Sequence, residues 1–132
     1  MELQKPSIIL ALDNEDSSNL LAGVLWLKGC NVYKVKSARE CVEQIKKLDS
    51  KVDVVVTGSE IAMDRDDNIV MSIKRMSMDI KVLAIGDENS DKTRILDYGA
   101  DEFALKPLSP ENTSDKILML LARDKVAENR AH

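Results

Sequence analysis

Five short apolar runs alternate with five segments of helical periodicity, and this alternation is the feature that most constrains the fold. The runs lie at residues 8–12, 31–36, 52–57, 80–85 and 102–105. The first run, IILAL, is typical of a strand buried on both faces, whereas NVYKVK has the polar interruptions of an edge strand. Because right-handed crossovers place successive helices above or below a sheet, strict alternation predicts a parallel sheet covered on both faces.

Helical patterns follow each predicted strand. Apolar residues recur at helical spacing up to Gly29, a plausible helix stop, and Ser37 with Glu40 makes the capping-box pattern that opens the next helix. We expect a third helix around residues 69–76, after an acidic loop, and a fourth from about 90 to 98. Ser109 and Pro110 are typical N-cap and first-turn residues of a last helix that runs to about Val126.

Length and composition predict one soluble globular domain. The 132 residues are 44% hydrophobic and 32% charged, which suits a single core. We expect this α/β domain to span residues 1–126, with a loose, disordered tail at 127–132. The net charge of -4 argues against a nucleic-acid partner, and the IILAL run is far shorter than a membrane span, so we expect no membrane contact and a cytoplasmic location.

Cysteine and histidine usage narrows the chemistry. Cys30 and Cys41 have neither the number nor the spacing of a disulfide framework or a metal site, so we expect reduced structural thiols. The only histidine is the terminal His132. Histidine-based catalytic triads and most zinc sites are therefore excluded.

Polar residues and glycines stand where the predicted strands end. In open α/β sheets the functional crevice lies at the carboxyl ends of the strands. The residues at those ends, in chain order, are Asp13, Asn14, Glu15, Asp16, Gly58, Ser59, Glu60, Gly86, Asp87, Lys106 and Pro107.

This order of residues resembles the receiver domains of response regulators in two-component signalling. The match runs from about residue 7 to 126, through IILALDNE, VDVVVTGSEIAMD, VLAIGD, YGADEF and ALKPLSPEN. The resemblance implies a flavodoxin-like (βα)5 three-layer sandwich whose five parallel strands have the order 2-1-3-4-5. It also implies phosphoryl transfer from a histidine kinase to an aspartate, with Mg²⁺ on an acidic pair, a hydroxyl after the fourth strand and a lysine after the fifth.

The acidic pair and the acceptor both depart from the family pattern. Asp13 matches the first acid of the pair, Asn14 replaces the second, and Glu15 matches the residue that follows. Since Mg²⁺ prefers carboxylates and Asn offers only a neutral oxygen, we expect no cofactor, or Mg²⁺ bound weakly. Counting along the third strand places the acceptor at Gly58, which has no nucleophile; an alternative register matches Glu60 with the acceptor.

At the remaining positions the chain keeps some of the family's functional residues and lacks others. Gly86 stands where the family has Ser or Thr, whereas Lys106 and Pro107 match its lysine and following proline. A surface lysine beside a turn proline is the other interpretation of that pair. Phe103 matches the family's aromatic switch position, although a plain core role is the favoured interpretation.

The leading hypothesis is a degenerate receiver that is not an enzyme and acts by contact with a protein, either a histidine kinase or a downstream signalling protein. The alternative is a working receiver in which Glu60, Asp64 or Asp66 accepts the phosphoryl group and Asp13 with Glu15 holds Mg²⁺. A flavin or nucleotide carrier would share the strand order, but the acidic DNEDSSN loop would repel phosphate. If Glu60 and Lys106 meet, an internal mimic of phosphate could hold the domain in one state.

Two surfaces are candidates for protein contact. Trp26 lies opposite the apolar stripe of its predicted helix, which predicts an exposed patch for a partner or for a homodimer. Tyr98 lies at the end of the fourth helix, within the surface that the family commonly uses with the fifth strand and the last helix.

Overall fold

Five parallel strands form one sheet at the centre of the computed structural model, which describes residues 5–62, 68–87, 90–106 and 109–130. The sheet order is β2-β1-β3-β4-β5, so the predicted order is confirmed. The parallel register brings the carboxyl ends of the strands to one edge. The strands are β1 (Ser7–Ala11), β2 (Asn31–Val35), β3 (Val54–Gly58), β4 (Lys81–Gly86) and β5 (Glu102–Leu105).

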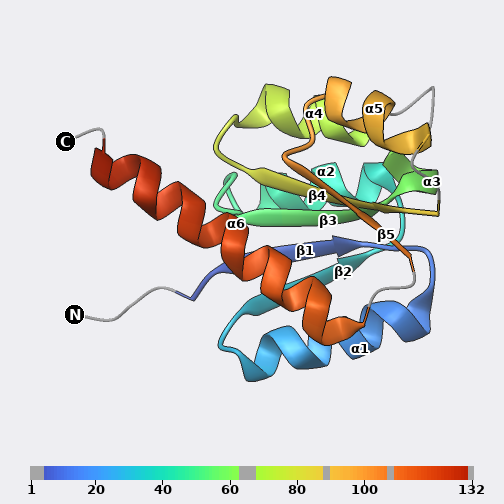
Figure 1. The fold of residues 1–132 in the computed structure, drawn as a ribbon, viewed down its shortest axis with the longest axis horizontal. Helices are drawn as coiled ribbons and strands as arrows, with labels where there is room; N and C mark the ends of the chain where they lie inside the picture. Colours follow the sequence, from blue (N-terminus) through green and yellow to red (C-terminus); the bar gives the residue numbers. More distant parts are fainter. Residues whose placement is uncertain (1–4, 63–67, 88–89, 107–108, 131–132) are drawn as a thin grey trace.

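Helices cover both faces of the sheet and complete the predicted three layers (Figure 1). One face carries α1 (Glu15–Leu27) and α6 (Pro110–Arg130). The other face carries α2 (Ala38–Lys47), α4 (Ile69–Met76) and α5 (Ser90–Asp97). A single turn, α3 (Ser59–Ala62), follows β3 directly.

Alternate residues of the central strands supply the two halves of the core. In β1, Ile8 and Leu10 pack with the α1 and α6 side, whereas Ile9 packs with the α2 and α4 side. All three are fully buried. Successive side chains of a strand point to opposite faces, so a strand between two helical layers must be apolar at every position.

The predicted helix ends are largely confirmed. The Oγ of Ser37 accepts a hydrogen bond from the backbone N–H of Glu40, but the Glu40 carboxylate accepts from Lys36 N–H rather than from Ser37 N–H, one residue earlier than in the usual capping box. Gly29 has φ +90°, a left-handed conformation that ends α1 without a Cβ clash. The Ser109 hydroxyl caps α6.

Two expectations about local structure are wrong. The segment after Gly58 is the helical turn α3, not the start of a loop. The last helix continues to Arg130, so residues 127–130 are helical rather than a loose tail. No glycine or proline follows Pro110 within α6, so no residue in that stretch breaks the helix.

A partly buried ion pair adds to the apolar contacts that hold α4 on the sheet. Lys74 Nζ lies 2.8 Å from Asp101 Oδ2 and donates to the carbonyl of Ile80 at 2.7 Å. The same Asp101 oxygen accepts from Val82 N–H at 2.8 Å. The Lys74 side chain is only 11% exposed, so water screens this pair little and α4 is held against the starts of β4 and β5.

The two cysteines are free and buried, as predicted. Burial raises the pKa of Cys41 to about 12, which makes its thiol inert at neutral pH. Within the described residues, no helix is both long and apolar enough to cross a membrane.

Candidate functional site

The carboxyl edge of the sheet brings Asp13, Glu60 and Lys106 around one cavity of about 320 Å³. This cavity lies beside the starts of α1 and α6, and Leu20 and Ile85 belong to its apolar wall. The three charged positions were predicted from the strand ends, whereas the apolar wall was not. Leu20 and Ile85 follow the ordinary apolar spacing of α1 and β4, so nothing in the sequence distinguishes them as residues of a cavity wall.

Glu60 occupies the space above Gly58. Gly58 is the last residue of β3, and Glu60 follows in the first turn of α3, from which its carboxylate folds back. A Cβ on residue 58 would lie 2.8 Å from Glu60 Cδ and nearer still to Oε1. Gly58 does not have a positive φ, so space rather than backbone conformation accounts for the glycine.

Lys106 extends over the same edge toward Glu60. Its backbone N–H donates to the carbonyl of Gly86 at 2.8 Å, which continues the β4–β5 pairing beyond the end of β5. Its Nζ lies 3.9 Å from Glu60 Oε2, and the side chains are 40% and 36% exposed respectively. At this distance and exposure the attraction is weak, but the two charged ends do meet over the edge of the sheet.

The pKa of Glu60 is raised above its ordinary value. Partial burial is the main cause, because it removes water from the charged form. Hydrogen bonding with Asp13 and repulsion from its carboxylate act in the same direction, whereas a backbone N–H and Lys106 act against them. The two carboxylates therefore crowd each other more than the lysine compensates.

The residues that the family resemblance assigns to magnesium have other surroundings at this edge. Asn14 lines the cavity, but its Oδ1 accepts a hydrogen bond from Ser17 N–H at 2.9 Å and caps α1. Glu15 is exposed in the first turn of α1. Among the described residues, no group of three or more His, Cys, Asp or Glu side chains could hold a metal ion. Pro107, Asp64 and Asp66 lie outside the described residues.

Phe103 occupies the space above Gly86 in the same manner. The Phe103 side chain is buried in the core, as the favoured interpretation predicts. A Cβ on residue 86 would lie 2.8 Å from Phe103 Cζ and 3.2 Å from the Cβ of Ser59. Ser59, one of the residues predicted at the end of the third strand, closes this space from α3.

The two predicted contact residues differ in exposure. Trp26 is 70% exposed on α1, which confirms the prediction from its helical position. Tyr98 is half-buried and packs against the core beside α5. Only Trp26 therefore presents most of its side chain to solvent.

Comparison with known proteins agrees with this fold. A family model described as the response regulator receiver domain matches residues 8–118. The chain belongs to the response regulator receiver family. It is 30% identical over 125 residues to the alkaline phosphatase synthesis transcriptional regulatory protein PhoP of Bacillus subtilis (strain 168). That match covers 90% of this chain and 50% of the relative, so the receiver chain spans about half the relative's length.

Solved structures share the fold of this receiver. The response regulator receiver domain protein from Clostridium thermocellum has a TM-score of 0.78 at 21% identity and covers 92% of this chain and 98% of its own. A response regulator from Thermotoga maritima has a TM-score of 0.78 at 16% identity, covering 90% and 99%. NtrX from Brucella abortus has a TM-score of 0.84 at 18% identity, covering 97% of this chain and 30% of that one.

Replacing Gly86 tests the packing of Phe103 in this receiver. We expect Gly86→Ala to destabilise the domain by about 1–3 kcal/mol, because the new methyl group overlaps the ring and the core must shift. In a Phe103→Leu background the same substitution should cost much less. Urea unfolding of the four proteins in this double-mutant cycle measures the coupling.

Gly23→Ala is the matched control, since no heavy atom lies within 4 Å of its Cβ position on α1. It should stabilise the domain by about 0.5–1 kcal/mol through helix propensity. If Gly86→Ala lowers the free energy of unfolding equally in the wild type and in Phe103→Leu, the Phe103 ring is not what resists a side chain at position 86.

The raised pKa of Glu60 predicts a pH-dependent effect on stability. The folded protein binds the proton of the Glu60 carboxyl group more tightly than the unfolded chain does. The stability that this proton contributes is therefore fully present below the ordinary pKa of 4.5, and it is lost as the pH rises through the pKa of the folded protein. Glu60→Gln should therefore be more stable than wild type at neutral pH, by about a few tenths of a kcal/mol because solvent screens the site. The difference should vanish in acid, as measured by urea unfolding at both pH values.

Glu43→Gln provides the control for loss of one carboxylate, since Glu43 belongs to an exposed pair with Arg39. A Glu60→Gln protein that is less stable than wild type at neutral pH would mean that attraction by Lys106 outweighs crowding by Asp13.

Proposed function

We propose that this receiver acts without phosphorylation of an aspartate at the end of β3. The supporting observation is that the Glu60 carboxylate fills the space where a side chain at position 58 would begin. The same carboxylate lies beside Lys106, so the edge carries a permanent negative charge where the family places a transient phosphoryl group. The domain is then a non-catalytic signalling module in the cytoplasm that needs no Mg²⁺.

The inward position of Phe103 supports the same proposal. In a receiver that responds to phosphorylation, the hydroxyl after β4 connects the phosphoryl group to the aromatic residue. Here Gly86 has no hydroxyl, and the Phe103 ring already fills the space above it. With neither acceptor nor connector, the domain holds one arrangement and signals through contact with a histidine kinase or a downstream signalling protein.

Incubation with acetyl phosphate and Mg²⁺, followed by intact mass measurement, tests this proposal. We expect no phosphoryl adduct on the wild-type chain. The double variant Gly58→Asp/Glu60→Ala restores the acceptor and removes its occupant, so it should gain an adduct under the same conditions. An adduct on a wild-type carboxylate, located by peptide mass spectrometry, would refute the proposal; at Glu60 it would establish the working receiver.

For the exposed face of α1, we infer pairing with a second copy of the chain. Leu20, Trp26 and Leu27 are 63%, 70% and 80% exposed, and three large apolar side chains on one helix are costly to leave in water. Gly23 lies between them with open space around it, which permits close approach of a second helix. The same face from two chains can form an isologous two-fold contact.

Sedimentation velocity over a range of concentrations tests the pairing. The wild-type chain should become dimeric as concentration rises, and Leu27→Ser/Trp26→Ser should stay monomeric. Met78→Ser, which removes an exposed apolar side chain outside α1, is the control and should dimerise as wild type does. A wild-type chain that remains monomeric at every concentration would rule the homodimer out.

A further inference from the structure

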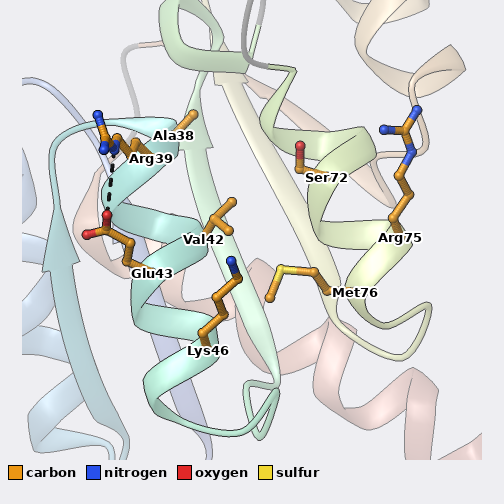
Figure 2. A pocket seen from close by; sticks show the side chains of 8 residues that line it. All are labelled: Ala38, Arg39, Val42, Glu43, Lys46, Ser72, Arg75 and Met76. Atoms are coloured by element: carbon orange, nitrogen blue, oxygen red, sulfur yellow. Dashed lines mark ion pairs between the residues drawn. The ribbon is translucent and has the colours of Figure 1, made fainter.

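A groove of about 650 Å³ runs between α2 and α4, and none of its lining residues belongs to the carboxyl-edge site. Its apolar part comes from Ala38 and Val42 on α2 and from Met76 on α4. Figure 2 shows Val42 and Met76 directed toward one another across the groove. The groove is therefore an open trough whose two walls are helices and whose floor is partly apolar.

Positive charge dominates the rim of this groove. Arg39, Lys46 and Arg75 supply three cations, whereas Glu43 supplies the single acid. Glu43 lies 3.6 Å from Arg39, and this exposed pair leaves an excess of positive charge on a chain whose net charge is -4. Within the described residues, Lys46 and Arg75 form no ion pair.

The orientation of α4 separates its two adjacent cations. Lys74 turns toward the sheet and pairs with Asp101, so it is unavailable to a partner. Arg75, the next residue, is exposed and lines the groove. The charge at this rim is thus held in place by the packing of α4 and does not depend on the carboxyl edge.

The spacing of the cations matches a helical ligand. Arg39 and Lys46 are seven residues apart on α2, a separation of about 10 Å along the helix axis. A helix that lies along the trough would present carboxylates two turns apart at the same spacing. Apolar side chains between them would contact Val42 and Met76, as in other helix-in-groove interfaces.

We propose that the α2–α4 groove binds an amphipathic acidic helix of a partner protein. Charge complementarity supports this occupant, because the groove is basic on an acidic chain and its floor is apolar. A small-molecule site would need convergent polar groups to orient its ligand. Among the described residues, no buried side-chain nitrogen or oxygen lacks a hydrogen-bond partner, and the cations that line the groove are on its exposed rim, so no buried polar group is left to orient a small molecule.

A synthetic peptide probe tests the proposal on the full chain. The probe is a fluorescein-labelled amphipathic helix with Leu on one face and Glu at positions seven residues apart on its flanks. Fluorescence anisotropy should show binding that weakens with salt, and amide shifts in ¹⁵N spectra should cluster on residues 38–46 and 72–76. Lys46→Glu/Arg75→Glu should weaken binding about tenfold or more.

Two controls separate groove binding from general charge attraction. Lys47→Glu/Lys92→Glu makes the same change in net charge at exposed positions that do not line the groove, and it should change affinity by less than about twofold. A probe with Lys in place of Glu should bind Lys46→Glu/Arg75→Glu but not wild type. Circular dichroism verifies that each variant is folded.

Several results would overturn the proposal. These are no binding of the acidic probe, equal weakening by both double variants, or amide shifts centred on α5, β5 and α6. Displacement of the probe by millimolar citrate alone would assign the groove to small anions instead. None of the described carboxyl-edge residues lines the groove. The result of the peptide-binding test therefore does not depend on whether the wild-type chain accepts a phosphoryl group.

Discussion

The packing of two side chains into spaces left by two glycines organises the carboxyl edge. Glu60 can fold over β3 only because residue 58 has no Cβ, and Phe103 can lie over β4 only because residue 86 has none. Neither glycine has a positive φ, so the backbone would accept another residue at both positions. A side chain at position 86 would meet the buried ring of Phe103, whereas one at position 58 would meet only the end of the flexible Glu60 side chain, which must then move away from β3.

A permanent carboxylate differs physically from a phosphoryl group that comes and goes. Phosphorylation changes both charge and shape, and the response follows from the difference between two states. At this edge the Glu60 carboxylate belongs to the chain and is neither added nor removed by a kinase; Lys106 attracts it and the Asp13 carboxylate repels it. A partner can shift a conformational equilibrium only by binding one state more tightly than another. If the edge holds one state, regulation must come from which partner is present.

Much of the fold follows from patterns that act over a few residues. Strand and helix alternation, the Ser37 cap and the Gly29 helix end depend on local periodicity and local hydrogen bonds, and these were predictable. The positions of Gly58 and Gly86 followed from counting along strands. The meeting of Glu60 with Lys106 could be named from the sequence only as an open possibility, because it depends on one unanticipated helical turn and on residues that are distant in sequence. The last helix was underestimated because no residue ends it.

The α2–α4 groove illustrates why a surface formed by two helices is harder to predict from sequence than the residues at the carboxyl edge of the sheet. Its rim joins residues of α2 and α4 that are about 30 positions apart and separated by β3, so no sequence window contains it. Its geometry depends on the rotation of α4, which the buried apolar residues of that helix and the Lys74–Asp101 pair fix together. A preformed groove loses little conformational freedom on binding. If the proposed loss of the phosphorylation switch holds, recognition falls to surfaces of this kind, whose charges are already in place before the partner arrives.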